Sequence, residues 1–480
     1  MRIAFLRIFL AGEFVSTFRF FNHHIRVPFL LLGLFEAGIL LSSVYIAVYI
    51  RFVGKTEKFE AGLGDLIWHA LIVSGLFILI FMSMGLYQSR MRDGVKGILF
   101  RLFIAYCIGV IGLNTLFYIF PSLYIGRGLL FLLLAISFIV ILNLRYLIIK
   151  TGGDIFKRRI LVLGTGKNAL SISNLKRKTD QIGFVLLGYV HLRGTKDEVD
   201  KNKIVELKMP LKEYCLRNEV DEIILAVEDR RKTFPVHELL DCRMSGVEVT
   251  ELATFFERET GKLKIDLLHP SWFIISSGFN KGLFYDASKR IFDLLVGLAL
   301  LLITWPLMLF TIIAIKLEDG SKASVLYKQI RIGKNNKPYH VYKFRSMQED
   351  AEQKGKAKWA DKKDSRITKL GAFIRKTRID ELPQIFNVLK GEMSFVGPRP
   401  ERPMFVVELS EKVPYYAERH RVKPGITGWA QICYPYGSSI KDAFEKLQYD
   451  LYYVKNYSIF LDMLILLQTA EVIMFGKGAR

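Results

Sequence analysis

The chain has 480 residues, enough for two or three domains with separate cores, and 51% of them are apolar. Its net charge is +22 at pH 7, but the Lys and Arg residues are dispersed and no nucleic-acid-binding motif accompanies them, which excludes nucleic acid as a partner. The charge suits anionic lipid headgroups and polyanionic substrates instead. The four cysteines lack metal-ligand or disulfide spacing, as expected in a reducing cytosol.

Residues 29–150 are predicted to form a four-helix transmembrane block, preceded by a basic interfacial segment at residues 1–28. The apolar runs long enough to cross a bilayer are Phe29–Ile50, Leu66–Leu86, Ile98–Phe120 and Leu129–Ile149. Basic residues precede the first run, separate the second from the third and follow the fourth, so both ends of the block are expected in the cytoplasm. Glu36, inside the first run, is either functional or faces another helix or a shallow interface.

Residues 151–280 alternate between strand and helix patterns, which predicts a Rossmann-like α/β domain. The expected strands are Ile160–Leu163, Phe184–Val190, Ile223–Val227 and Val247–Thr250. A Gly-x-Gly-x-x-Ala turn follows the first strand at residues 164–169. Dinucleotide binding needs an acid at the end of the second strand, where His191 stands instead. We therefore expect a scaffold that binds no ligand tightly and is a candidate for homodimer formation.

The apolar segment at residues 291–316 is about long enough to span a bilayer. The domain before it starts on the cytoplasmic side, and basic residues flank both ends of the segment. Pro306 removes a helix hydrogen bond near its middle. These constraints predict a re-entrant helix that bends at Pro306 and returns, against the alternative of a straight fifth span.

Adjacent acids, Asp380 and Glu381, precede an apolar stretch that stops at Gly391, and a Gly- and Pro-rich loop with Arg399 follows. One acid can attack phosphorus or hold a metal, while the guanidinium fork matches phosphate oxygens. The alternative is helix capping, with Asp380 as N-cap and Gly391 as C-cap. Both interpretations stand together, because a helix N-terminus also attracts an anion.

Several ordered blocks carry a family resemblance: Lys289–Asp293, Tyr342–Met347, Asp364–Thr368, Thr377–Pro400, Pro424–Gln431 and Tyr449–Val454. From about Lys289 onward the chain resembles the bacterial sugar transferases, the monotopic phosphoglycosyl transferases, in their long form with an N-terminal membrane block. The resemblance implies that residues 281–480 form a mixed, mainly helical catalytic domain with the re-entrant membrane helix.

The resemblance also implies an activity. A hexose-1-phosphate passes from a UDP-sugar to undecaprenyl phosphate at the cytoplasmic face of the bacterial inner membrane and initiates a polysaccharide or glycoconjugate. In the implied mechanism Asp380 is the nucleophile and forms a covalent aspartyl phosphosugar intermediate. The implied cofactor is Mg²⁺, held by Asp380 and Glu381. The implied phosphate binders are Lys343, Arg345, Arg366, Arg375 and Arg399. Trp305 stands where the family commonly has Ser before the Pro, and Thr304 is its candidate replacement as hydrogen-bond donor.

Two other functions stay open. Tyr285 and Lys289 have the Tyr-x-x-x-Lys spacing of short-chain dehydrogenases, which suggests a membrane-bound sugar-nucleotide dehydratase or epimerase. The missing ribose acid opposes it, and Lys289 already belongs to a transferase block. The other alternative is a non-enzymatic membrane scaffold.

Overall fold

The computed structural model divides into two compact units, Met1–Thr260 and Gly261–Arg480. It describes all residues except 1–16, 21–22, 53–65, 85, 88–93, 152–156, 176–182, 193–195, 229–233, 269–271, 273–275, 277, 280–281, 321–323, 348–365, 435–436, 438 and 476–480.

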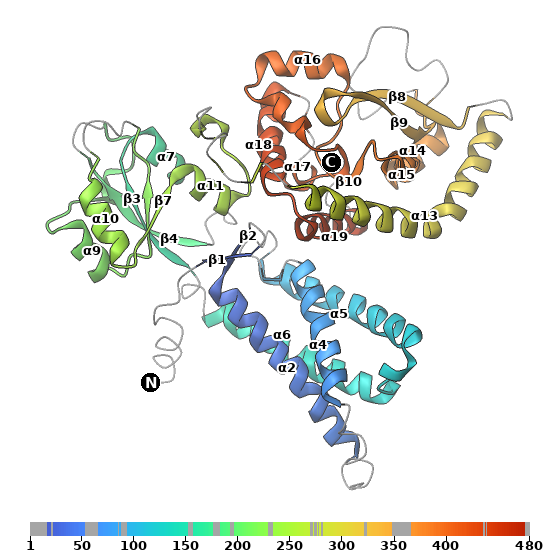
Figure 1. Ribbon diagram of the computed structural model, residues 1–480, viewed down its shortest axis with the longest axis horizontal. Coiled ribbons are helices and arrows are strands. Elements are labelled where there is room, and N and C mark those ends of the chain that lie inside the picture. Colours follow the sequence, from blue (N-terminus) through green and yellow to red (C-terminus); the bar gives the residue numbers. More distant parts are fainter. Residues whose placement is uncertain are drawn as a thin grey trace. The chain divides into compact units, whose positions relative to one another are not determined.

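The four predicted apolar runs are helices (Figure 1): α2 (Val27–Phe52), α4 (Leu66–Ser83), α5 (Gly94–Ile119) and α6 (Arg127–Thr151). Three of them contain segments long and apolar enough to cross a membrane, and Leu66–Met82 is a shorter apolar helix. A short 3-10 turn, η1 (Pro121–Leu123), precedes α6. Within the predicted N-terminal interfacial segment, β1 (Thr17–Phe20) and β2 (His23–Arg26) pair antiparallel, and residues 1–16 lie outside the described part.

Glu36 is fully buried among the membrane helices and faces two polar partners. Its Oε1 lies 2.7 Å from Arg145 Nε of α6. Arg145 Nη2 donates to Oε2 at 2.8 Å, and the hydroxyl of Tyr87 donates to the same oxygen at 2.6 Å. The charge is therefore compensated inside the helix bundle. Of the interpretations of Glu36, the structure supports the one in which it faces another helix.

The α/β part of the first unit is a five-stranded sheet in the order β5-β4-β3-β6-β7, and every paired strand is parallel. Its elements are β3 (Arg158–Leu163), α7 (Lys167–Ser173), β4 (Phe184–Val190), η2 (Lys201–Lys203), β5 (Ile204–Val205), α9 (Leu211–Arg217), β6 (Glu222–Leu225), α10 (Val236–Met244), β7 (Glu248–Glu251) and α11 (Leu252–Thr260). The four strands expected from the sequence are present. The sheet buries Val- and Ile-rich strands between helices, which explains their continuous apolar runs.

The Gly-rich turn after β3 is occupied by a side chain of the protein itself. Gly164 has φ +118, and a Cβ there would lie 2.9 Å from the carbonyl oxygen of Ala226. Glu228 Oε1 accepts the backbone N–H groups of Lys167 at 2.7 Å and Asn168 at 3.3 Å. These are the donors that would face the pyrophosphate of a dinucleotide. An internal carboxylate therefore takes the place of an external anion.

The second unit is mainly helical, with two small sheets. Its elements are η3 (Ile265–Leu267), α13 (Leu283–Asp319), β8 (Leu326–Ile332), η4 (Lys334–Asn336), β9 (Pro338–Phe344), α14 (Lys369–Lys376), η5 (Ile379–Glu381), α15 (Gln384–Lys390), β10 (Ser394–Val396), α16 (Pro403–Lys412), η6 (Tyr416–Arg421), β11 (Gly425–Thr427), α17 (Trp429–Cys433), α18 (Ile440–Asn456) and α19 (Ile459–Phe475). Strands β8 and β9 pair antiparallel, and β10 and β11 pair parallel.

Helix α13 contains the whole predicted segment at residues 291–316 and has Pro306 inside it. Figure 1 shows that its ribbon turns sharply partway along its length, a shape that a re-entrant path requires. Thr304 does not serve the carbonyl that Pro306 frees, which belongs to Leu302, because its hydroxyl donates to Leu300 at 2.7 Å.

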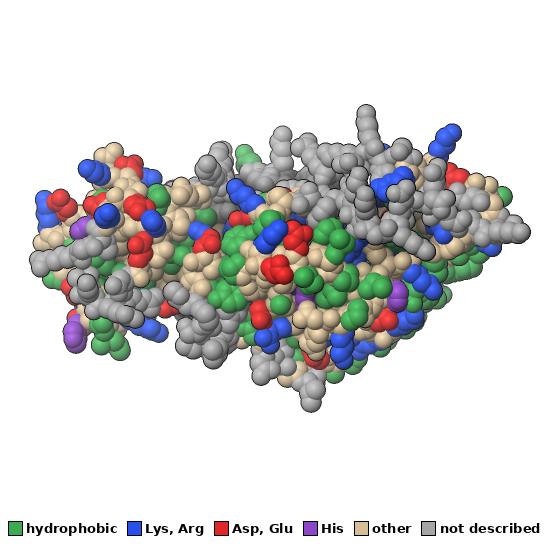
Figure 2. All heavy atoms as spheres, turned by 90° about the horizontal axis from the view of Figure 1, so that it is seen from above, with side chains coloured by type: hydrophobic (Ala, Val, Ile, Leu, Met, Phe, Trp, Pro, Cys, Tyr) green, Lys and Arg blue, Asp and Glu red, His purple; other side chains and the backbone are tan. Residues whose placement is uncertain are grey.

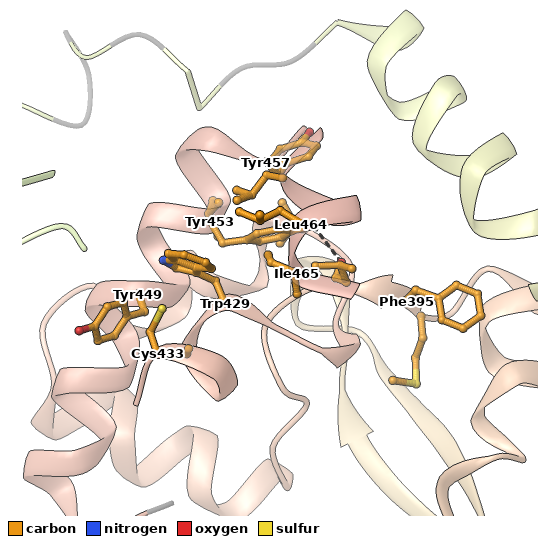
Figure 3. Packing of buried hydrophobic residues seen from close by; sticks show 14 of the residues in the cluster. Phe395, Trp429, Cys433, Tyr449, Tyr453, Tyr457, Leu464 and Ile465 are labelled. Carbon is orange, nitrogen blue, oxygen red and sulfur yellow. Dashed lines mark hydrogen bonds between the residues drawn. The ribbon is translucent and has the colours of Figure 1, made fainter. Parts of the chain in front are cut away.

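The core of the second unit lies between α17, α18 and α19. Figure 3 shows Tyr449 and Tyr453 of α18, and Tyr457 just after it, close to Trp429, Leu464 and Ile465. The buried residues of α18 and α19 supply much of this core, so that part of the apolar surface of both helices serves the fold.

The second unit begins before the apolar helix α13. The indole N–H of Trp429 donates to the carbonyl of Gly261 at 2.7 Å, and Leu263 N–H donates to Gln448 at 3.0 Å. Lys262 pairs with Glu445 at 2.9 Å. These contacts anchor the segment at 261–263 on α17 and α18. The division therefore falls about twenty residues earlier than the boundary expected at residue 281.

The charge of the surface is mixed. On the face shown in Figure 2, Lys and Arg side chains lie among acidic and apolar ones rather than in one continuous basic patch. A dispersed distribution of this kind is what the sequence indicated.

Candidate functional site

The two adjacent acids lie in a tight turn between α14 and α15. Arg378 takes the left-handed conformation at φ 61, and the 3-10 turn η5 follows with Asp380 and Glu381 in it. Helix α15 begins only at Gln384, after Pro383. The interpretation of Asp380 as a helix N-cap is therefore wrong, and with it the idea that capping aims the helix dipole at a phosphate. A short-range turn, forced by the left-handed residue, presents the acids instead.

The other end of α15 was predicted correctly. Gly391 is its C-cap at φ 87, a left-handed conformation in which glycine has no steric cost. Arg290 donates from both terminal nitrogens to the free carbonyls of Val388 and Leu389, each at 2.6 Å. A cation at a helix C-terminus also matches the helix dipole.

Glu381 is surrounded by cations. Its Oε1 lies 2.7 Å from Lys343 Nζ and 3.5 Å from Arg399 Nη2, and its Oε2 lies 4.0 Å from Arg378 Nη1. Burial opposes ionisation of Glu381, but Lys343 and Arg399 outweigh it and lower its pKa to about 2. Glu381 is therefore a fixed anion that holds Lys343 and Arg399 at the site.

Asp380 differs from its neighbour. It is 8% exposed, and its carboxylate has neither a hydrogen bond nor an ion pair with any residue that the structure describes. Burial, followed by the charge of Glu381, raises its pKa, while Lys343, Arg378 and Arg375 act in the opposite direction. A carboxylate that no described residue binds keeps both oxygens available for reaction.

Only some of the predicted phosphate binders lie close to Asp380 and Glu381. Lys343 and Arg399 contact Glu381 directly, and Arg375 of α14 lies close enough for its charge to act on Asp380. Arg345 follows β9, and Arg366 stands beside the bridge between Met347 and Ile367. Neither of these two pairs with Asp380 or Glu381.

Asn387 is a site residue that the sequence did not reveal. It is fully buried on α15. Its Nδ2 donates to the carbonyl of His340 at 2.7 Å, and its Oδ1 accepts from Tyr342 N–H at 3.1 Å. Glu392 accepts from the same Nδ2 at 2.7 Å. Asn387 thereby fixes β9, which carries Lys343, against the helix that follows the acids. A lone Asn in an apolar stretch gives no sequence signal of this role.

The Lys289–Asp293 block is structural. Lys289 Nζ donates to Asp462 Oδ2 at 2.5 Å and to the Tyr453 hydroxyl at 3.1 Å, and it is buried. Asp293 Oδ1 accepts from Ser394 Oγ at 2.9 Å. The hydroxyl of Tyr285 donates to the carbonyl of Tyr457 at 2.8 Å. Lys289 and Tyr285 are thus used in packing α13 against α18, α19 and β10, which opposes the dehydrogenase interpretation.

Asp380 and Glu381 suit a magnesium ion only in combination with a substrate. Among the described residues, no group of three or more His, Cys, Asp or Glu side chains is arranged to hold a metal. Mg²⁺ commonly takes one or two carboxylates and completes its shell with substrate phosphates and water. The carboxylate of Asp380, which no described residue binds, lies beside Glu381 and fits that mode of binding.

Comparison with known proteins places the chain in a family. The profile of the bacterial sugar transferase family matches residues 284–476. A protein of Haemophilus influenzae named an uncharacterized sugar transferase is 31% identical over 381 residues, which cover 75% of this chain and 79% of that protein. The Klebsiella pneumoniae UDP-glucose:undecaprenyl-phosphate glucose-1-phosphate transferase is 33% identical over 335 residues, 67% of this chain and 69% of that protein.

A third relative matches more strongly over a shorter stretch. The Aeromonas hydrophila UDP-N-acetylgalactosamine-undecaprenyl-phosphate N-acetylgalactosaminephosphotransferase is 43% identical over 242 residues. The match covers 50% of this chain and 56% of that protein, so the chain spans just over half the length of this relative. The family profile and the two longer matches confirm the resemblance seen in the sequence blocks, and the chain belongs to the bacterial sugar transferase family.

Proposed function

We propose that this protein transfers a sugar-1-phosphate from a UDP-sugar to undecaprenyl phosphate and so initiates a polysaccharide or glycoconjugate. The observation that carries the proposal is the contrast within the acid pair. Glu381 is held by three cations, whereas the buried carboxylate of Asp380 has no partner among the described residues. The names of the Klebsiella and Aeromonas relatives support the same acceptor lipid.

The reaction then has two balanced steps. A carboxylate oxygen of Asp380 attacks the phosphorus that carries the sugar, the bond from that phosphorus to the UMP oxygen breaks, and UMP leaves with the electron pair. A phosphate oxygen of the lipid next attacks the same phosphorus, and the bond to Asp380 breaks to restore the carboxylate. Lys343 and Arg399 lie where they can stabilise the charge on the phosphate oxygens in both steps.

The groups around the acids support this role for Asp380. Burial and the charge of Glu381 raise the pKa of Asp380, while Lys343, Arg378 and Arg375 favour its ionised form, which is the form that can attack phosphorus. We propose that Asp380 and Glu381 hold Mg²⁺ together with the substrate diphosphate. The ion supplies charge neutralisation, without which carboxylates and phosphates repel each other.

The membrane arrangement is part of the proposal. Both termini and the catalytic unit lie on the cytoplasmic side of the bacterial inner membrane, and α13 enters and leaves the bilayer on that side. The bend of α13 and the internal Pro306 support this path. A re-entrant helix keeps the acids at the surface where the lipid phosphate lies.

We further propose that the α/β domain is a Rossmann-like scaffold without a bound dinucleotide. Its strand order and its Gly turn support the assignment, and the carboxylate of Glu228 at that turn opposes pyrophosphate binding. Homodimer formation through this domain stays a prediction of the sequence.

The test is release of UMP from UDP-sugars by the purified full-length protein in lipid nanodiscs with undecaprenyl phosphate. The panel is UDP-glucose, UDP-galactose and their N-acetylated forms, since the sugar differs among the relatives. Asp380→Asn should abolish UMP release and formation of the lipid product, while Asp241→Asn, an exposed Asp on α10, should leave both unchanged. Full activity of Asp380→Asn would refute the mechanism, and an inactive wild-type protein across the panel would favour the scaffold alternative.

A further inference from the structure

The loop that carries Arg399 has no regular secondary structure, yet its backbone is held at every residue from Gly397 to Glu401. Gly397 N–H donates to Thr427 at 2.9 Å, and the carbonyl of Pro398 accepts from Gly425 N–H at 3.0 Å. The carbonyl of Glu401 accepts from Ile332 N–H at 3.0 Å. Strands β8 and β11 therefore hold the two ends of the loop.

Two arginines hold its centre. Arg331 Nη1, from β8, donates to the carbonyl of Pro400 at 3.1 Å. Arg419 Nη2, from η6, donates to the carbonyl of Arg399 itself at 2.9 Å. The loop is also closely packed, because a Cβ on Gly397 would lie 2.3 Å from the carbonyl oxygen of Lys423. An irregular segment can be rigid when its backbone is hydrogen-bonded at every residue.

Arg419 is fixed in turn by buried groups. Nη2 lies 2.8 Å from Asp450 Oδ2, and only 6% of the Arg419 side chain and 4% of the Asp450 side chain are exposed. Nη1 donates to the hydroxyl of Tyr416 at 2.7 Å. Three partners around one planar guanidinium define its orientation, and a lysine ammonium cannot reproduce that geometry. Removal of one member would leave a buried charge without its partner.

The hydrogen bond from Arg419 to the carbonyl of Arg399 fixes the orientation of the Arg399 peptide. Pro398 and Pro400 have fixed φ angles, and a residue before proline is restricted to extended conformations. The direction of the Arg399 carbonyl depends on the ψ angle of Arg399. Because Arg419 donates a hydrogen bond to that carbonyl, it fixes this angle. The side chain of Arg399 is 40% exposed and reaches Glu381 at 3.5 Å. A half-exposed side chain depends on its backbone for direction.

We propose that Arg419 is a positioning residue for Arg399: anchored by Asp450 and Tyr416, it holds the Arg399 peptide so that the guanidinium points to the phosphate subsite beside Glu381. The inference rests on the proposed function, in which Arg399 binds substrate phosphate. Arg419 itself is buried beneath the loop and touches no reacting atom.

The test is a double-mutant cycle on kcat/KM for UMP release from the preferred UDP-sugar. Arg419→Lys should lower kcat/KM about tenfold in the wild-type background, because a misdirected phosphate ligand loses transition-state contacts. If Arg419 acts through Arg399, the same change in an Arg399→Ala background should cost no more than about twofold. An equal loss in both backgrounds, or no loss in the wild-type background, overturns the proposal.

Further variants separate positioning from folding. Asp450→Asn and Tyr416→Phe each remove one anchor of Arg419 with little change in shape, and each should show the same dependence on Arg399, which keeps the test open if Arg419→Lys does not fold. Lys262→Gln is the matched control, since it breaks an ion pair with Glu445 on α18 without touching the loop, and it should leave kcat/KM unchanged. Activity of Asp380→Asn would refute the proposed function, whereas additive losses in the cycle refute only the role of Arg419.

Discussion

Glu36 and Asp380 are both buried carboxylates close to arginine, one among the membrane helices and one in the catalytic unit. Both oxygens of Glu36 face Arg145, and Tyr87 donates to one of them. Asp380 has no such partner among the described residues, and two of the cations whose charge acts on it, Lys343 and Arg378, pair with Glu381 instead. The first arrangement compensates a charge and joins helices, and the second leaves a charge available.

The difference shows how burial of an acid can be interpreted. A buried carboxylate with matched donors is explained by packing, because its desolvation is offset locally. A carboxylate whose pKa is raised by burial and by a neighbouring charge, and that no described residue binds, is instead a candidate for chemistry, since such groups concentrate at functional sites. The comparison can be tested by substitution. Loss of a structural acid or its partner should lower stability, whereas loss of a reactive acid should lower the reaction rate.

The largest effect is expected in the membrane block. Arg145→Gln leaves Glu36 buried without its cation, which should lower the free energy of unfolding by about 3–5 kcal/mol. Thermal unfolding in nanodiscs measures the change. The double variant Glu36→Gln/Arg145→Gln should lose less stability than either single variant, and strict additivity would contradict a direct pair.

Glu381→Gln should act mainly on rate. It frees Lys343 and Arg399 from their fixed anion, and kcat should fall by about 10²–10³-fold, as when one group that preorganises charge stabilisation is removed. The measurement is UMP release at saturating UDP-sugar. Glu408→Gln, which breaks only the exposed pair with Lys412, is the control and should keep wild-type kcat.

The α/β domain contains a third buried acid, Glu222, which like Glu36 is paired with arginines. Burial opposes ionisation of Glu222, but Arg258 and Arg158 outweigh it and hold its pKa below the ordinary 4.5. Its contribution to stability is therefore complete above the unfolded pKa and is lost as pH falls through the folded pKa. Unfolding of the domain followed from pH 7 to pH 3 should show a loss of stability that is absent in Glu222→Gln. A Glu222→Gln profile as steep as that of the wild type would rule out this residue as the cause.

The smallest effect concerns the Gly turn. Glu228→Ala removes the acceptor of two backbone N–H groups at the start of α7 and should destabilise the domain by about 1 kcal/mol, as loss of a helix cap does. Glu206→Ala, an exposed acid without a described partner, is the control and should change stability little. Unchanged stability of Glu228→Ala would show that the contact adds nothing to the fold.

Much of the architecture was predictable because it depends on local patterns. Apolar runs of bilayer length predicted α2, α4, α5 and α6, and short Val- and Ile-rich runs predicted the strands of the parallel sheet. Gly391 was recognisable as a helix C-cap because a left-handed residue favours glycine. Asp380 was wrongly assigned as an N-cap, since the preceding left-handed residue is Arg378, which no local rule predicts.

The sequence by itself determined the membrane block, the strand and helix order of the α/β domain, and the acid pair with its candidate phosphate binders, because composition, periodicity and motif spacing are local properties of the chain. Only the tertiary structure decided that Glu381 takes the cations while no described residue binds Asp380, that Glu228 fills the Gly turn, and that Arg419 lies beneath Arg399. Each of these contacts is between residues far apart in the chain. Such contacts depend on how side chains share a limited set of partners once the core is packed, and no spacing rule encodes that choice.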